Sequence, residues 1–243
     1  MAYVLILGAT SDIALEIAKK YAGEGYDLHL AGRKISQLER IKNDLCVRYE
    51  RDVKVCSFDA LRYENHQAFY KQLYPEPEIT VLVFGAMYEE EEAIKDWTLA
   101  SKMIHTNYTG AVSILNIIAN DYIKKAAGTI IGISSVAGDR GRKSKLIYGS
   151  AKAAFSTYLS GLRNWCAHHE VHVMSVKPGF VATQMTEHLN LPKSLTAQPD
   201  QVAKAVFNAV KKKKNVIYVK WFWRYIMLII KLIPEPIFKK LNL

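Results

Sequence analysis

The stretch that decides the fold of this chain runs from Tyr3 to Ala14 and reads Tyr-Val-Leu-Ile-Leu-Gly-Ala-Thr-Ser-Asp-Ile-Ala. Its first five residues form an unbroken apolar run, which predicts a buried strand. The run ends in a glycine turn, and apolar side chains then recur at helical spacing at Ile13, Ile17 and Tyr21. A buried strand, a tight turn and a helix make up the unit from which parallel α/β domains are built.

The rest of the chain repeats this alternation. Further apolar runs predict strands at Asp27–Ala31, Val53–Phe58, Ile79–Phe84, Thr129–Ser134, Val171–Lys177 and Val216–Val219. Apolar spacing predicts the other helices at Ser36–Tyr49, Asn65–Leu73, Leu99–Ala126, Ile147–His168 and Pro199–Lys211. The acidic run Glu89–Glu92 indicates a loop. Continuous apolar strands separated by helices are typical of a parallel sheet with both faces covered.

The predicted fold class is therefore α/β, a single Rossmann-type, doubly wound domain with a seven-stranded parallel sheet. It occupies residues 1–219, and a basic, apolar, helical C-terminal tail follows over residues 220–243. The 243 residues suffice for one such domain, and no linker or internal repeat interrupts them. Because ligands of such sheets bind at the carboxyl ends of the strands, the residues just after each strand are the candidate site residues.

Charge is concentrated at the end of the chain. Nine basic residues and one acidic residue lie between Lys211 and Leu243, so this region holds most of the net charge of +10. A nucleic-acid-binding protein would spread its basic residues over one face of the fold, so an anionic membrane surface is the better candidate partner. The apolar N-terminus runs straight into the glycine turn and indicates a strand, not a signal peptide. Three cysteines without disulfide or metal spacing indicate free thiols, and we expect a cytoplasmic protein at the inner face of the cytoplasmic membrane.

The turn after the first strand is a candidate phosphate-binding site. Small residues let the backbone approach a pyrophosphate, and the next helix points free N–H groups at it. Of the three usual glycines only Gly8 is present, because Asp12 and Ala14 occupy the other two positions. A carboxylate at Asp12 repels a phosphate unless it turns away, and a plain strand–helix turn remains the alternative interpretation. The candidate cofactor residues here are Gly8, Thr10, Ser11, Asp12 and Ile13.

The end of the second predicted strand bears on the choice of cofactor. An acidic residue there would bind both ribose hydroxyls, but the chain has Arg33, whose guanidinium suits a 2′-phosphate. NADP(H) is therefore the preferred cofactor, with NAD(H) not excluded. Asp59, after the third strand, is a candidate for the adenine amino group. The alternatives are that Arg33 covers a solvated turn and that Asp59 caps a helix.

A second constellation indicates acid–base chemistry. Tyr148 and Lys152 are four residues apart on a predicted helix and share one face. A nearby ammonium group stabilises a phenolate and lowers the tyrosine pKa. Ser135 lies at the carboxyl end of the fifth predicted strand, thirteen residues before Tyr148.

With these residues the sequence resembles the classical short-chain dehydrogenase/reductase family from Tyr3 to about Val219. Asn107, Thr183, Pro178-Gly179 and Phe84-Gly85-Ala86, the last in place of the family's Asn-Asn-Ala-Gly, add to the resemblance. It implies the catalytic residues Asn107, Ser135, Tyr148 and Lys152. It also implies a cofactor site that adds Arg33, Asp59, Gly85, Tyr148, Lys152, Pro178, Gly179, Val181 and Thr183 to the turn residues, and it implies no metal.

The resemblance also implies a role for each catalytic residue. Tyr148 would exchange a proton with the carbonyl oxygen, and Ser135 would polarise that oxygen. Lys152 would lower the pKa of Tyr148 and hold the nicotinamide ribose. Asn107 would support a water relay, and Thr183 would bind the carboxamide. A homodimer or homotetramer is the implied assembly.

The tail narrows the resemblance. Aromatic, apolar and basic residues alternate from Trp221 to Ile233, a length too short to span a bilayer but suited to an interfacial helix. The tail looks like the C-terminus of decaprenylphosphoryl-2-keto-erythro-pentose reductases. Two motifs within the domain, Asn107-Tyr108-Thr109 and Gly138-Asp139-Arg140, add to this resemblance. The implied substrate is the 2-keto group of a polyprenyl-phosphate-linked sugar.

Other interpretations remain open. The chain could reduce a small soluble ketone, sugar or acyl substrate, with the tail packed on the domain or on a partner subunit. A non-catalytic nucleotide sensor or scaffold is a second alternative, although such modules usually lack the tyrosine or the lysine. Metal chemistry at His168, His169 and His172 is a third, but adjacent histidines on a helix point about 100° apart and do not converge.

Overall fold

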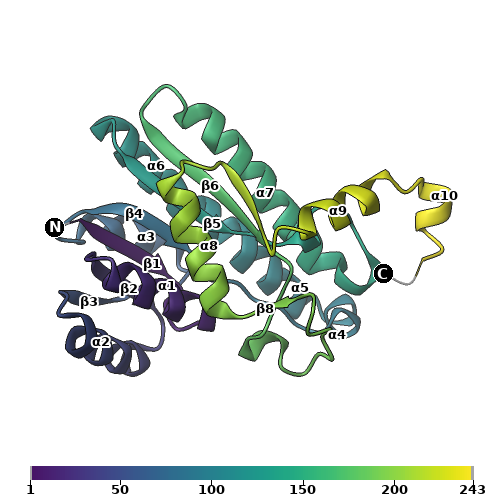
Figure 1. Ribbon diagram of the computed structural model, residues 1–243, viewed down its shortest axis with the longest axis horizontal. Coiled ribbons are helices and arrows are strands. Elements are labelled where there is room, and N and C mark those ends of the chain that lie inside the picture. The colour runs from purple at the N-terminus through teal and green to yellow at the C-terminus, as the bar shows by residue number, and fades with distance from the viewer. Residues whose placement is uncertain (1, 242–243) are drawn as a thin grey trace.

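A seven-stranded parallel sheet forms the centre of the protein, which a computed structural model describes for residues 2–241 (Figure 1). Met1 and residues 242 and 243, which belong to the predicted domain and tail, lie outside that range. The strand order is β3-β2-β1-β4-β5-β6-β9. The strands are β1 (Tyr3–Leu7), β2 (Asp27–Gly32), β3 (Val53–Ser57), β4 (Pro77–Leu82), β5 (Gly128–Ile133), β6 (Val171–Pro178) and β9 (Val216–Val219). Each of the seven predicted strands is present.

Helices cover both faces of the sheet because successive strand residues point to opposite sides. In β1, Val4 and Ile6 pack with α1 (Asp12–Gly23), α2 (Ile35–Tyr49) and α8 (Pro199–Lys211). Leu5 and Leu7 pack on the other side with α3 (Tyr63–Lys71), α6 (Gly110–Lys125) and α7 (Leu146–Cys166). All four of these β1 side chains are fully buried. The predicted doubly wound α/β fold is confirmed.

The sheet order places the ligand crevice. From β1 the chain moves outward to β2 and β3, then returns to the other side of β1 with β4. The loops after β1 and β4 therefore diverge and leave a crevice at the carboxyl ends of the strands. The predicted site residues lie at this end of the sheet.

Two predicted elements differ from the structure. The predicted helix Leu99–Ala126 is divided into α5 (Trp97–Ile104), a π-helical turn at His105–Thr109 and α6. Within that turn, the Asn107 side chain donates a hydrogen bond to the Met103 carbonyl oxygen, an acceptor that regular helix geometry would give to the backbone. The predicted acidic loop is instead the helix α4 (Glu90–Lys95), whose inner side chains Glu90 and Ala93 are buried.

The tail packs against the domain. Helix α9 (Trp223–Leu232) buries Trp223 and Met227 against a small apolar cluster that includes Val136 and Phe180. The short helix α10 (Glu235–Phe238) follows and projects from the right of Figure 1. Within residues 2–241, no helix combines the length and the apolar character needed to cross a bilayer.

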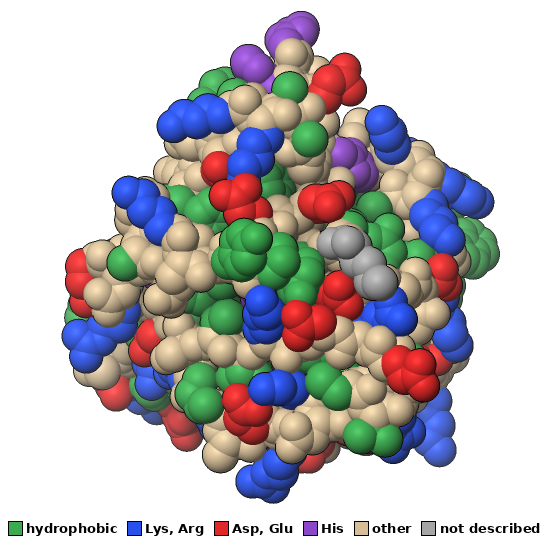
Figure 2. Space-filling view, turned by 90° about the vertical axis from the view of Figure 1, so that its left-hand side faces the viewer, with side chains coloured by type: hydrophobic (Ala, Val, Ile, Leu, Met, Phe, Trp, Pro, Cys, Tyr) green, Lys and Arg blue, Asp and Glu red, His purple; other side chains and the backbone are tan. Residues whose placement is uncertain are grey.

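The two ends of the molecule differ in surface character. The outer face of α9 exposes large apolar side chains: Tyr225, Leu228, Ile229 and Leu232. Figure 2 shows the side of the molecule that lies on the left in Figure 1, where Lys and Arg are interspersed with Asp and Glu around a group of hydrophobic side chains.

Candidate active site

Two adjoining hollows lie at the carboxyl ends of the strands. The larger measures about 450 Å³ and contains Ser135, Tyr148 and Lys152. The smaller measures about 210 Å³ and contains Arg33 and Asp59. Ser11, Val83, Gly85 and Met185 line both hollows and join them into one groove. Every residue that the sequence predicted for catalysis or cofactor binding lines this groove, except Asn107, which lies behind Gly85.

The glycine turn has the geometry of a phosphate cradle. Gly8 has a φ of 89°, and a Cβ there would lie 2.6 Å from the backbone nitrogen of Phe84, so no larger residue fits. Ser11 caps α1, its hydroxyl accepting a hydrogen bond from the Ala14 N–H at 3.3 Å. The first turn of α1 therefore presents its backbone and positive dipole end to the groove.

The adenosine end of the groove carries the residues proposed to select the cofactor. Arg33 is exposed and lies on the rim of the smaller hollow, and Lys34 lines the larger one. Asp59 accepts a hydrogen bond from the Leu61 N–H at 3.0 Å, so it stabilises its own turn while it faces the groove. Asp59 does not cap a helix, because α3 begins after Arg62 without a side-chain cap, but it lies in the groove as predicted.

Tyr148 lies at the start of α7, where its phenol is buried in the groove. Burial raises the pKa of Tyr148 to about 12, and a hydrogen bond with the Ser135 side chain offsets part of that rise. At neutral pH the phenol is therefore protonated and is an acid for a bound carbonyl oxygen.

Lys152 lies one helical turn further along α7. Burial lowers the pKa of Lys152 to about 8. Its Nζ donates a hydrogen bond to the Ile133 carbonyl oxygen at 3.1 Å and lies 5.8 Å from the centre of the Tyr148 ring. In this arrangement the ammonium is directed at a carbonyl oxygen, and the predicted lowering of the Tyr148 pKa by Lys152 stays a prediction.

Asn107 connects the π-helical turn to the strand loop beside the catalytic lysine. Its side-chain nitrogen donates hydrogen bonds to the carbonyl oxygens of Ala86 at 2.6 Å and Met103 at 2.9 Å. A Cβ at Gly85 would lie 2.8 Å from Asn107 Oδ1 and 3.6 Å from Lys152 Nζ. The Asn107 amide oxygen and the Lys152 ammonium thus both border the space that a side chain at Gly85 would fill.

Glu90 is a site residue that the sequence did not reveal. It is 6% exposed, and its carboxylate accepts hydrogen bonds from the backbone N–H groups of Ile147 at 3.0 Å and Tyr148 at 3.1 Å. The residue before α7 makes no side-chain cap, so Glu90 satisfies the first N–H groups of the catalytic helix from another element. The sequence does not distinguish Glu90 from its neighbours, because it is one of four consecutive glutamates.

Comparison with known proteins decides the family. A family profile described as short chain dehydrogenase matches residues 2–194. The chain belongs to this family. An uncharacterized oxidoreductase of Mycobacterium tuberculosis is 31% identical over 241 residues, which cover 98% of this chain and 96% of the relative. An uncharacterized oxidoreductase of Streptomyces coelicolor is also 31% identical over 241 residues, which cover 98% of this chain and 95% of the relative.

Solved structures share the fold. A short-chain dehydrogenase from Sphingobium yanoikuyae in complex with NADPH has a TM-score of 0.83 at 21% identity, covering 90% of this chain and 87% of its own. Actinorhodin polyketide ketoreductase with NADPH has a TM-score of 0.81 at 19% identity, covering 91% and 97%. The family assignment makes this chain an oxidoreductase that interconverts C=O and CH–OH groups with a nicotinamide cofactor.

The residues of the groove fit that cofactor. The cradle at Gly8 and the first turn of α1 suit a pyrophosphate, and Lys152, Pro178, Gly179, Val181 and Thr183 line the hollow that contains Tyr148. The bound nicotinamide supplies or accepts the hydride. Tyr148 and Ser135 line this hollow, where they would supply an acid and a hydrogen-bonding group.

The histidines considered for metal binding have other surroundings. His172 Nε2 hydrogen-bonds to the Lys214 carbonyl oxygen at 3.0 Å. Across residues 2–241, no three His, Cys, Asp or Glu side chains come together as metal ligands.

Proposed function

We propose that this protein is an NADP(H)-dependent reductase of a ketone on a polyprenyl-phosphate-linked sugar, acting at an anionic membrane surface. The observation that carries the proposal is the position of the tail. Trp223 of α9 lies so close to Gly179 in the cofactor groove that a Cβ there would come within 2.0 Å of the indole. The helix that exposes apolar side chains therefore adjoins the chemistry.

The tail also holds the segment that borders the substrate side of the groove. Trp223 Nε1 donates a hydrogen bond to the Leu195 carbonyl oxygen at 3.2 Å, and Lys220 Nζ donates one to the Ser194 carbonyl oxygen at 3.0 Å. A tail seated on a bilayer would place the groove near the headgroups, where a lipid-linked sugar phosphate lies. The basic residues of the tail suit that anionic surface.

Two features support a reductive direction and NADP(H). The protonated phenol of Tyr148 is an acid, as ketone reduction needs. The guanidinium of Arg33 lies on the rim of the smaller hollow, the adenosine side of the groove, and would attract a 2′-phosphate. The resemblance of the tail to lipid-linked keto-pentose reductases supplies the substrate class.

The test is NADPH oxidation, followed by absorbance, with a synthetic prenyl-phosphate keto-pentose in vesicles containing anionic lipid. We expect turnover that depends on this substrate and falls by about 10²–10⁴-fold in Tyr148→Phe, the usual size of a general-acid contribution. The kcat/KM should be lower with NADH than with NADPH. Arg33→Ala should reduce the ratio of these two values.

The alternatives give different results. Turnover of soluble ketones but not of the lipid-linked sugar would identify a small-molecule reductase and contradict the proposed substrate class. Tight NADPH binding without turnover of any ketone would favour a nucleotide sensor or scaffold.

A further inference from the structure

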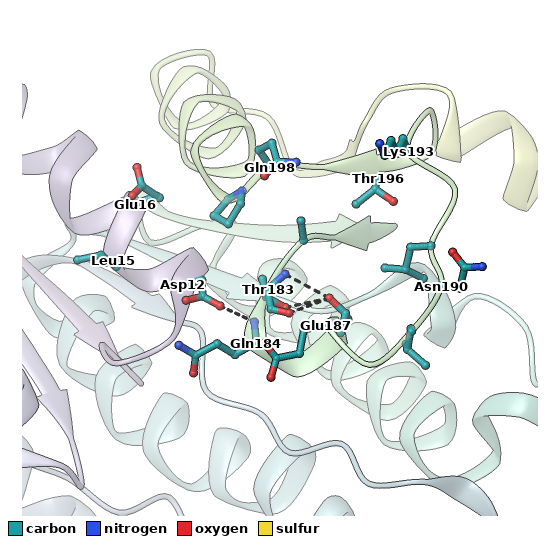
Figure 3. A pocket seen from close by; sticks show the side chains of 15 residues that line it. Asp12, Leu15, Glu16, Thr183, Gln184, Glu187, Asn190, Lys193, Thr196 and Gln198 are labelled. Atoms are coloured by element: carbon teal, nitrogen blue, oxygen red, sulfur yellow. Dashed lines mark hydrogen bonds between the residues drawn. The ribbon is translucent and has the colours of Figure 1, made fainter.

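A single hydrogen bond joins the phosphate turn to the segment opposite the catalytic tyrosine. The backbone N–H of Gln184 donates to Asp12 Oδ2 at 2.8 Å, across 172 residues of sequence (Figure 3). Asp12 lies in the first turn of α1, and Gln184 begins a short 3₁₀ turn that ends at Thr186. In Figure 3 the Asp12 carboxylate points at this turn.

The segment that Asp12 holds is a wall of the catalytic groove. Residues 183–186 line the same hollow as Tyr148 and Lys152, and Met185 also lines the smaller hollow. The turn is stabilised internally, because Thr186 Oγ1 donates to the Val181 carbonyl oxygen at 2.6 Å and accepts from the Thr183 N–H at 3.2 Å. It can therefore move as a unit, and movement away from α1 would open both hollows.

On the other side of this contact lies an open hollow of about 860 Å³, larger than the catalytic one. Asp12, Thr183, Gln184 and Thr186 line both, so the Asp12–Gln184 contact separates the two spaces (Figure 3). The wall therefore has open space behind it into which it can swing.

The segment also has other contacts: directly before the wall, the Ala182 N–H donates a hydrogen bond to the Ala197 carbonyl oxygen at 2.9 Å. His188 Nε2 lies 3.0 Å from Glu89 Oε1, but both side chains are about half exposed, and such pairs contribute little. The tail holds the segment near Leu195, eleven residues beyond Gln184. The bond at Asp12 is also solvent-exposed, but it joins a carboxylate to a backbone N–H, the stronger class of hydrogen bond.

The same contact accounts for an acidic residue beside a phosphate cradle. A carboxylate near the first turn of α1 would repel a pyrophosphate. Here the Asp12 carboxylate accepts a hydrogen bond from the Gln184 N–H, so its negative charge is directed at the wall and not at the pyrophosphate site. We propose that Asp12 is a positioning residue that latches the 183–186 wall over the cofactor groove and thereby sets how long the nucleotide stays bound.

The experiment measures NADPH release by stopped-flow fluorescence, with excess NADP⁺ as the chase, in the full-length protein. In Asp12→Ala, release should be about tenfold faster, since a hydrogen bond to a charged group contributes about 1.4 kcal/mol or more and 1.4 kcal/mol is a factor of ten. Asp12→Asn keeps a neutral acceptor and should fall between Asp12→Ala and the wild type. Glu16→Gln is the matched control: Glu16 lies on the same helix, lines the outer hollow and pairs with Lys19 at 2.7 Å.

Hydrogen exchange on the protein alone supplies a second readout that needs neither nucleotide nor substrate. Amides of residues 183–190 should exchange faster in Asp12→Ala, with much smaller changes in the rest of the protein. Unchanged release and exchange in Asp12→Ala would overturn the latch. Slower release would overturn it too, because Asp12 would then act only by repelling the pyrophosphate. Neither outcome depends on the ketone, so the latch and the proposed substrate fail separately.

Discussion

At the scale of single residues, Tyr148 and Lys152 are two groups whose pKa values burial moves apart. Burial raises the pKa of Tyr148 to about 12 and lowers that of Lys152 to about 8. Both groups are consequently protonated at neutral pH. In the proposed reduction the phenol would be the proton donor, and the ammonium would supply the positive charge that stabilises the developing phenolate.

This pair predicts the pH dependence of ketone reduction. The charge on Lys152 is present below its pKa of about 8 and is lost as the pH rises through that value, whereas Tyr148 stays protonated. The kcat/KM for reduction should therefore fall above about pH 8, measured at constant ionic strength with NADPH. A profile that stays flat to pH 10 would contradict the role given to Lys152.

Glu90 should hold the catalytic helix in place. Glu90→Gln leaves one acceptor for two N–H groups and places an amide donor against them, so it should lower the free energy of unfolding by about 1–3 kcal/mol. It should also lower kcat more than it raises KM, because Tyr148 is displaced from the reacting oxygen.

Glu91→Gln is the matched control. It removes the same charge from the same helix, but at a residue whose side chain is exposed. It should change stability by less than about 0.5 kcal/mol. Equal kinetics for the two variants would show that Glu90 does not position Tyr148.

At the scale of elements, α9 has two faces with separate roles. Its inner face buries Trp223 and Met227 beside the groove, and Arg140 donates hydrogen bonds to the Ile230 and Ile233 carbonyl oxygens at its C-terminal end, at 2.6 and 2.7 Å. Its outer face is apolar and exposed. The inner face therefore belongs to the fold, and the outer face is available to a membrane.

Substitutions should separate these faces. Trp223→Ala removes a buried indole and should destabilise the fold by about 3–5 kcal/mol in thermal unfolding. Replacing Leu228, Ile229 and Leu232 by Ser should leave the Tm nearly unchanged but abolish sedimentation with anionic vesicles. Vesicle binding that survives the triple substitution would contradict the membrane role of the tail.

The elements also show what a sequence can predict. Unbroken apolar runs located all seven sheet strands, because burial on both faces leaves a continuous signal. Helix α4 could not be found in the same way, since its helical state depends on Glu90 meeting the first N–H groups of α7, 57 residues away. The π-helical turn at Asn107 likewise depends on side-chain contacts with Ala86 and Met103.

At the scale of the whole molecule, the sheet order brings together a site drawn from most of the chain. The predicted site residues come from different strands, loops and helices, and the parallel sheet places them at the carboxyl ends of its strands. They are the glycine turn, Asn107, Ser135, Tyr148 and Thr183. Their residue types were predictable from spacing and family resemblance. Two contacts could not be predicted: the hydrogen bond between Asp12 and Gln184, and the packing of Trp223 on Gly179. Each joins segments far apart in the chain, and neither segment's sequence indicates which other segment it contacts. The predicted homodimer or homotetramer stays a prediction, which light scattering coupled to size exclusion would test.

The most direct test of the central claim compares NADPH binding and turnover in the wild type and Tyr148→Phe. The substitution removes the proton donor but leaves the phosphate cradle, so the NADPH Kd should stay within about threefold of the wild type. Ketone-dependent NADPH oxidation should fall by about 10²–10⁴-fold, the contribution typical of a general acid. Absence of NADPH and NADH binding in the wild type, or undiminished turnover in Tyr148→Phe, would contradict the claim.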